Sequence, residues 1–428
     1  MAAFVVVGRV GFDPNEGRTP GQARFAILEK KEDFVRDGTR EVLLRGMHGK
    51  VRFRVQRYHE RSTGLKKSYF DLTDQFREGY LSLRLKEFVT YYAGRISYEE
   101  VEHLLMRTTG AKLLSDQKIQ QLVVQKAAAL SRMQQARLTR LKTRPMPAVC
   151  RAVDLYAAET REVVLMEDGI QVKQQKAERE RRHGAAGWQP PGEAPPLSEQ
   201  KPRKKRVTTD VAMLEKRDGS YEHLCGGIDE HGREALYDVA EAVRGAVVEH
   251  YGNNEGTPLA VVAITDGAQN IRSHLERVFG GPIPVILDWY HLCKRLRELI
   301  SMIARCKTER ERHLERLFGH LWRGQTEQAL AYLRSSTEVT ARHPEKLAAL
   351  ITYLEKHQHE IVDYERRKQA GKTIGSGRME KGVDQVIGHR QKKKGMSWSE
   401  KGSKALGILR VVELNGQWEE VWSGGAAA

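Results

Sequence analysis

The sequence predicts an α/β protein built from several domains. Its 428 residues exceed what one hydrophobic core usually organises. Stretches with the apolar alternation of strands give way, more than once, to stretches with apolar residues at helical spacing. A hydrophobic fraction of 40% is enough for a buried core, yet every apolar run is far shorter than the ~20 residues that cross a bilayer. We therefore expect neither a membrane partner nor a signal peptide.

Residues 1–82 are predicted to form a β-rich N-terminal region. The clearest strand is Val51–Tyr58, in which Val51, Phe53 and Val55 alternate with basic residues. The Arg-rich side of that strand is suited to phosphate contact, although a solvated strand face is an equally good interpretation.

Residues 83–145 are predicted to hold a helix-turn-helix and a basic connector. Ser97 is a candidate N-cap with Glu100 three residues on, and Gly110 is a helix stop. A second short helix follows Ser115. Its apolar side points inward, and its polar side would probe DNA through Gln117, Lys118 and Gln121. A plain helical hairpin remains the alternative. Residues 130–145 continue with a helical pattern that ends before Pro145, and we interpret them as a basic connector along DNA or simply as a solvated helix.

Residues 146–289 are predicted to form the first part of the catalytic core, with a flexible loop at residues 174–206. Strands are expected in EVVLMEDGIQVKQ, RVTTDVAMLEK and YEHLCGGID, followed by a helix, the buried strand PLAVVAIT, another helix and the strand IPVILD. Three antiparallel strands, a helix and further parallel strands follow the ribonuclease H-like order. Residues 290–370 are predicted to be a helical insertion, and residues 371–428 the C-terminal helices and tail of the core.

The charge balance favours nucleic acid as partner. The chain has 72 Lys and Arg against 56 Asp and Glu, a formal net charge of +16, and such an excess attracts polyanions through counterion release. The four cysteines contain no CxxC pair, which argues against a zinc finger or a disulfide framework and suits a reducing cytoplasm.

Three acidic residues fall where this strand order would bring them together. Asp168 lies in the first strand, Asp266 at the end of the buried strand, and Glu380 at the opening of a C-terminal helix. Phosphodiester chemistry needs such a cluster, because two Mg²⁺ ions ~3.5 to 4 Å apart activate the attacking hydroxyl and stabilise the leaving oxygen. Mg²⁺ prefers oxygen ligands, so we predict two ions, with Mn²⁺ as a substitute, on these three carboxylates. Asp210 in the second strand is the alternative for the first position.

These blocks resemble those of bacterial insertion-sequence DDE transposases of the ISKra and ISLre types. The resemblance rests on TDGAQNI, ILDWYHLCKRL and GSGRMEKGVDQVIGHRQKKKGMSWSEKGSKALGILR, in that order, and extends over residues 45–412. It implies metal-binding roles for Asp168, Asp266 and Glu380. It also places Asp288 and His291 in a D-x-x-H block, where the histidine would orient a carboxylate or contact DNA, or simply be structural.

The terminal block also supplies predicted DNA contacts at Arg390, Lys392, Lys393 and Lys394, although a basic run is equally compatible with a solvated surface, and Trp398 is expected to pack. Two features depart from the pattern: the loop after the first strand is unusually long and Pro-rich, and no cysteine precedes Cys150.

The sequence therefore predicts a DNA transposase. It would bind the terminal inverted repeats of its element as double-stranded DNA, cleave strands at the element's ends and join the 3′-hydroxyls to target DNA. Two ends must be held at once, so a homodimer or larger assembly is expected. The expected location is the bacterial cytoplasm, at the nucleoid. The alternatives are an inert or domesticated DNA-binding protein of the same fold, and a ribonuclease H-like nuclease without strand transfer.

Overall fold

The computed structural model describes residues 34–68, 80–175, 206–229, 231, 235–253 and 256–423. The chain divides into two compact units, one of Met1–Leu130 with Ala405–Ala428 and one of Ser131–Lys404. The division falls within one long helix. The predicted flexible loop at 174–206 lies almost entirely outside the described residues.

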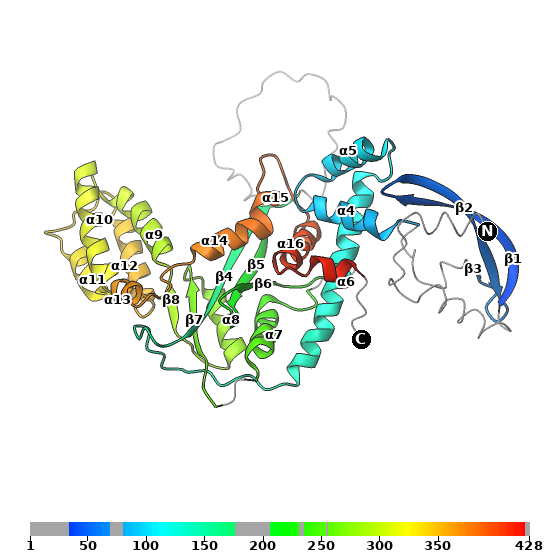
Figure 1. Ribbon diagram of the computed structural model, residues 1–428. Coiled ribbons are helices and arrows are strands. Elements are labelled where there is room, and N and C mark those ends of the chain that lie inside the picture. Colours follow the sequence, from blue (N-terminus) through cyan, green and yellow to red (C-terminus); the bar gives the residue numbers. More distant parts are fainter. Residues whose placement is uncertain are drawn as a thin grey trace, which may run out of the picture. The chain divides into compact units, whose positions relative to one another are not determined.

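The first unit contains a small antiparallel sheet in the order β1-β2-β3. Its strands are β1 (Phe34–Gly46), β2 (Gly49–Glu60) and β3 (Lys66–Ser68) (Figure 1). The strand predicted at Val51–Tyr58 is confirmed as the centre of β2, and Val55 is buried as its alternation indicated.

Three helices follow in this unit: α4 (Leu83–Ala93), α5 (Tyr98–Thr109) and α6 (Asp116–Lys142). Ser97 and Glu100 form the predicted capping box at the start of α5, and Gly110 ends it in the left-handed conformation. The Ser115 hydroxyl accepts from the Lys118 backbone N–H, as expected of a cap.

The second predicted helix is much longer than expected. With 27 residues, α6 runs on through most of the segment interpreted as a separate basic connector. Helix-forming residues continue without Gly or Pro until Pro145, so nothing in the chain ends the helix earlier.

The second unit is built on a mixed five-stranded sheet in the order β6-β5-β4-β7-β8. Antiparallel pairing joins β4 to β5 and β5 to β6, whereas β4, β7 and β8 run parallel. The strands are β4 (Glu162–Lys173), β5 (Arg206–Glu215), β6 (Tyr221–Cys225), β7 (Ala260–Thr265) and β8 (Val285–Leu287). Every strand predicted in this region is present.

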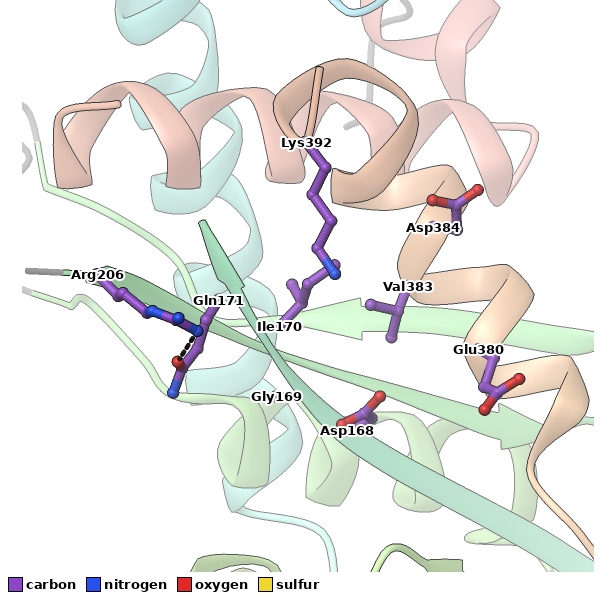
Figure 2. Close-up of a pocket in the computed structure, with 9 residues that line it drawn as sticks. All are labelled: Asp168, Gly169, Ile170, Gln171, Arg206, Glu380, Val383, Asp384 and Lys392. Atoms are coloured by element: carbon purple, nitrogen blue, oxygen red, sulfur yellow. Dashed lines mark hydrogen bonds between the residues drawn. The ribbon is translucent and has the colours of Figure 1, made fainter. Parts of the chain in front are cut away.

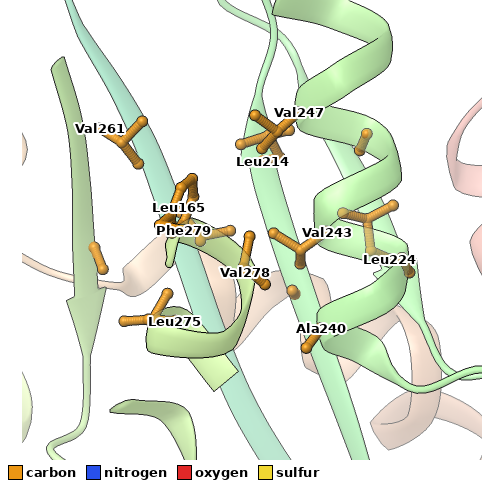
Figure 3. Packing of buried hydrophobic residues seen from close by; sticks show 14 of the residues in the cluster. Leu165, Leu214, Leu224, Ala240, Val243, Val247, Val261, Leu275, Val278 and Phe279 are labelled. Carbon is orange, nitrogen blue, oxygen red and sulfur yellow. The ribbon is translucent and has the colours of Figure 1, made fainter. Parts of the chain in front are cut away.

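Helices α7 (Val239–Tyr251) and α8 (Gln269–Phe279) cover one face of this sheet. Their apolar sides bury a cluster that includes Leu165, Leu214, Val243, Leu275 and Phe279 (Figure 3). Helix α7 begins at Val239 because Asp238 and Glu241 form a reciprocal capping box there.

A helical region follows β8, as predicted for residues 290–370 (Figure 1). It consists of α9 (Trp289–Ile303), α10 (Lys307–Trp322), α11 (Thr326–Arg334), α12 (Pro344–Lys356) and α13 (Tyr364–Gln369). The C-terminal elements are α14 (Gly377–Val383), the π-helix η1 (Asp384–Gly388), α15 (His389–Gln391), α16 (Glu400–Leu414) and α17 (Trp418–Trp422). No helix in the described part of the chain is both long and apolar enough to cross a membrane.

A buried ion pair ties α13 to the start of β4. The Arg367 guanidinium donates to both carboxylate oxygens of Glu162, at 2.9 and 2.6 Å, and to the carbonyls of Leu155 and Thr373. Arg367 is fully buried. Because Nε, Nη1 and Nη2 of Arg367 each donate to an oxygen, this pair holds the segment before α14 against the sheet.

We predict that Arg367→Ala lowers the free energy of unfolding by about 3–5 kcal/mol, because it leaves the Glu162 carboxylate buried without its partner. Urea unfolding of the full chain measures the loss. The exposed neighbour Arg366, which lies over the Tyr156 ring, is the matched control, and Arg366→Ala is expected to lose no more than about 1 kcal/mol. Equal losses in the two variants would contradict the role given to the buried pair.

Candidate catalytic site

Asp168 lies on the face of β4 opposite the α7 and α8 core. Side chains alternate along a strand, so Asp168 shares its face with Met166 and Ile170, whereas Leu165 points into the core cluster. The register places Met166 beside Met213 of β5. That methionine contacts α14, since a Cβ on Gly382 would lie only 2.5 Å from its Sδ. Asp168 therefore faces α14.

Asp266 follows the last residue of β7, in a turn that only glycine completes. Its Oδ1 accepts from the Ala268 backbone N–H at 2.8 Å, and Gly267 has a φ of +87°. A Cβ on Gly267 would lie 2.5 Å from the His357 ring. That ring bonds Glu360 at 2.6 Å, and Glu360 pairs with Arg272 at 2.6 Å. The turn that carries Asp266 is thus held from behind by a buried polar network.

Asp288 is a fully buried carboxylate that joins two segments of the site. Its Oδ1 accepts from the backbone N–H groups of Tyr290 and His291 and so caps α9. Its Oδ2 accepts from the backbone N–H of Ser376 at 2.7 Å and from the Ser376 hydroxyl. The His291 Nδ1 lies 3.3 Å from the same oxygen. Because its oxygens accept from protein donors, Asp288 positions these segments, and its predicted catalytic role stays a prediction.

Glu380 lies in the first turn of α14, one helical turn after Ser376, the serine that Asp288 binds. Its backbone N–H donates to the Ser376 carbonyl at 2.9 Å, and its carboxylate lies 4.0 Å from the His291 Nε2. The helix then widens into the π-helix η1, a local irregularity often found at functional sites. Because Asp288 holds both Ser376 and His291, it sets the positions of Glu380 and His291 together.

The charges of these residues interact. Burial raises the pKa of Asp168, and the negative charges of Asp266 and Glu380 raise it further, while His291 opposes them. The hydrogen bond to Asp288 raises the pKa of His291, and the charges of Asp288, Asp266 and Glu380 add to this effect. Burial acts to raise the pKa of Asp288, but the hydrogen bonds from His291 and Ser376 outweigh it and hold that pKa below its usual range. The structure thus brings Asp168, Asp266, Glu380 and His291 into one electrostatic neighbourhood.

Asp210, the alternative for the first acidic position, lies on the other face of the sheet. It pairs with Gly169, and a Cβ on Gly169 would lie 3.0 Å from the Asp210 Oδ1. Asp210 instead influences Glu167, a buried residue whose Oε1 lies 2.6 Å from the His274 Nδ1. Burial raises the pKa of Glu167 to about 7. The hydrogen bond from His274 acts to lower this pKa, and the negative charges of Asp210 and Asp238 act to raise it. Asp210 therefore belongs to a second polar group, apart from Asp266 and Glu380.

A cavity of about 470 Å³ lies beside Asp168. Figure 2 shows the carboxylates of Asp168 and Glu380 facing the same space between β4 and α14. Asp384, one turn beyond Glu380, also lines the cavity, and Arg206 and Lys392 line it farther along β4. The cavity is thus acidic at one end and basic at the other.

The residues present fit a hard divalent cation in their chemistry. Three carboxylates share the neighbourhood, two of them raise the pKa of the third, and oxygen is the ligand that Mg²⁺ prefers. Among the described residues, no three His, Cys, Asp or Glu side chains are already arranged around one metal position. The Glu380 side chain is 60% exposed, so its rotamer is free to change when a cation binds.

The predicted DNA contacts in the terminal block differ in their accessibility. Lys392, Lys393 and Lys394 are exposed. Arg390 is only 3% exposed, and its guanidinium lies 4.7 Å from the centre of the Trp398 ring. Arg390 therefore packs against Trp398, and its role as a DNA contact stays a prediction. Trp398 packs as expected, with its ring N–H donating to the Gln391 carbonyl.

In the first unit, the predicted DNA-reading positions on α6 lie on its solvent side. Gln117 and Gln121 are exposed and Lys118 is half-buried, while Ile119, Leu122 and Val123 are buried.

Sequence reasoning missed three residues of the site. Asp384 was detectable, because it follows Glu380 by four residues and so shares its helix face. Ser376 gave only the weak signal of a polar residue before a helix. Arg206 gave none, since its place beside Gln171 depends on the register of β4 against β5.

The chain belongs to the uncharacterised protein family UPF0236. The model of that family matches residues 161–423, which include the whole candidate site. The family is associated with transposase-like proteins. No curated protein matches the chain.

We predict that Glu167→Gln stabilises the protein at pH 8 but not at pH 5. A folded-state pKa of about 7, above the ordinary 4.5, means that the protonated carboxyl favours folding. That contribution is complete below about pH 4.5 and is lost as the pH rises through about 7. The expected gain at pH 8 is on the order of 1–3 kcal/mol, measured by urea unfolding in EDTA. The exposed α8 residue Glu276 supplies the control Glu276→Gln, and a gain that does not depend on pH would refute the assignment.

Proposed function

We propose that the chain is a DDE-type transposase whose second unit is a ribonuclease H-like catalytic domain. The observation that carries the proposal is the electrostatic neighbourhood of Asp168, Asp266, Glu380 and His291, drawn from four separate segments on one face of the sheet. Like charges brought to about 4 Å would repel by roughly 4 kcal/mol at an effective dielectric of 20, so drawing these carboxylates around one position requires a cation.

The strand order supports the fold assignment. Three antiparallel strands in chain order, followed by two parallel strands added beside the first, give the order 3-2-1-4-5 when the five strands are numbered along the chain. This is the order expected for a ribonuclease H-like domain. In it the first acid sits in the first strand and the second acid follows the fourth, as Asp168 and Asp266 do. The long helical region lies between β8 and the helix of Glu380, where an insertion was predicted.

Each residue is assigned a separate part in the chemistry. Asp168, Asp266 and Glu380 would hold divalent cations, and a bound pair of Mg²⁺ ions supplies an activated hydroxyl and a stabilised leaving oxygen. Asp288 accepts the Nδ1–H of His291 and leaves the Nε2 directed to Glu380. A protonated His291 would orient the Glu380 carboxylate or contact a phosphate oxygen. Asp288 also fixes Ser376 and through it the start of α14.

The remaining parts of the proposal concern DNA. The exposed polar side of α6, with Gln117 and Gln121, would bind the terminal inverted repeats. The excess of 72 Lys and Arg over 56 Asp and Glu would favour binding to the phosphate backbone of DNA. Water is the first nucleophile and the released 3′-hydroxyl the second, so no covalent enzyme intermediate is required. Joining two ends requires at least a dimer on DNA.

We predict that Asp266→Asn abolishes strand cleavage, by at least about 10³-fold, while DNA binding stays within about twofold. The substrate is a linear duplex carrying the DNA that flanks the coding sequence on each side, with Mg²⁺ or Mn²⁺ as the cation. Asp210→Asn is the matched control, because Asp210 lies on the opposite face of the sheet, and it is expected to cut at the wild-type rate. Equal cutting by Asp266→Asn would remove Asp266 from the mechanism.

The same substrate distinguishes the alternatives when its ends are supplied already cut. A transposase joins the 3′-hydroxyls to a target plasmid, whereas a nuclease of the same fold binds these ends and never joins them. Binding without cutting or joining in either metal would identify an inert DNA-binding protein.

A further inference from the structure

The sheet leaves part of the β4 edge open beside the site. β7 pairs with β4 only from Glu162 to Met166, whereas β5 pairs with the other edge as far as Lys173. At the far end the Trp398 backbone N–H donates to the Lys173 carbonyl. Between Met166 and Lys173, no other described strand pairs with this edge of β4. Strand edges present backbone N–H groups to whatever lies beside them.

The cavity described above lies along this open edge. Its lining includes β4 from Asp168 to Gln171, with Asp168 and Glu380 at one end and Arg206 and Lys392 toward the other. The side chains of Gln171, Arg206 and Lys392 lie on the same side of Asp168 in Figure 2, away from Glu380. The charge of the cavity therefore changes sign along the strand.

At the basic end of the cavity, Arg206 forms a hydrogen bond with the uncharged side chain of Gln171. Its Nη1 donates to the Gln171 Oε1 at 3.2 Å, which uses one of the five N–H donors of a guanidinium. Across the residues that the structure describes, no carboxylate forms an ion pair with Arg206 or with Lys392. A positioned guanidinium, an ammonium group and a strand edge together suit a phosphodiester oxygen.

We propose that the basic end of this cavity is a subsite for two backbone phosphates, one bound by Arg206 and one by Lys392, of the DNA strand whose scissile phosphate reacts at Asp168. The inference rests on the proposed function for the identity of the acidic end. From Asp168 to Gln171 the strand advances about 10 Å at ~3.3 Å per residue. That is the length of about three nucleotides of stacked strand at ~3.4 Å each. The subsite thus sets the direction in which the strand crosses the site, along β4.

The test compares two double variants that remove the same two positive charges. Arg206→Gln with Lys392→Gln removes the subsite. Lys173→Gln with Lys356→Gln removes two exposed cations that lie outside the cavity lining and are not among the predicted DNA contacts. Binding of fluorescein-labelled dT12 to the full chain is measured by anisotropy in EDTA over a range of KCl concentrations.

The subsite double variant is expected to bind dT12 about 25-fold more weakly at 0.1 M KCl, and its slope of log affinity against log salt is expected to fall by about 1.4, at ~0.7 for each phosphate contact. The charge-matched control is expected to keep most of the wild-type slope. Arg206→Lys with Lys392→Arg, which keeps both charges, should restore binding. If Arg206→Gln unfolds the protein, Lys392→Gln alone carries the test, with a slope change of about 0.7.

An unchanged slope in the subsite variant, or an equal loss in the control, would overturn the subsite. This outcome differs from failure of the proposed function, because binding in EDTA requires no cleavage. If the wild-type chain cuts DNA but the salt slope of the subsite variant is unchanged, only the subsite proposal is refuted. Loss of binding in the subsite variant of a chain that never cuts would retain the subsite and remove the transposase assignment.

Discussion

The carboxylate of Asp288 is the constraint on which the rest of the site depends. One buried side chain caps α9, holds the Nδ1 of His291 and binds the backbone and hydroxyl of Ser376 at the start of α14. These contacts join two segments separated by 88 residues of chain. A lone buried carboxylate would be strongly unfavourable, but hydrogen bonds that favour its ionised form keep its pKa low. Its negative charge in turn favours the protonated form of His291. Glu380 and His291 are therefore positioned by one and the same carboxylate.

The sheet supplies the other half of the site through its two faces. Successive residues of β4 point to opposite sides, so Glu167 and Asp168 enter different environments although they are adjacent. Glu167 meets His274 on the side of α7 and α8, and Asp168 meets the charges of Asp266 and Glu380 on the side of α14. Alternation along the strand separates the two acidic groups without any additional device. It also decides between Asp168 and Asp210 for a position facing α14.

Much of the fold could be predicted from the sequence, because strand alternation and helix caps are local. The five strands of the large sheet and the capping box at Ser97 follow from short patterns. The first residue of α7 does not follow from such a pattern, because the helical spacing of apolar residues continues upstream of Asp238. The Asp238 side chain caps the helix, so α7 begins at Val239. The three acids could be singled out because each lies beside a recognisable block, and the structure places their charges near one another. The burial of Arg390 could not be predicted, because a basic residue in a basic run gives no sign that it packs on Trp398. The hydrogen bond between Arg206 and Gln171 depends on the register of β4 against β5. No short sequence pattern in either strand reveals that register.

The open edge of β4 and the crowded acids are consequences of one arrangement. β7 ends at Thr265, directly before Asp266, and in the described part of the chain its pairing with β4 stops at Met166, while β5 still pairs with the other edge of β4. An unpaired edge is a liability in most sheets, and three neighbouring carboxylates destabilise any fold that holds them without compensation. Both are tolerated here because rigid contacts lie behind them. The Glu360 network backs the Asp266 turn, Gly382 lets α14 approach β5, and the Arg367–Glu162 pair anchors the chain before α14. Local unfavourable features that the surrounding structure maintains in this way are typical of functional sites.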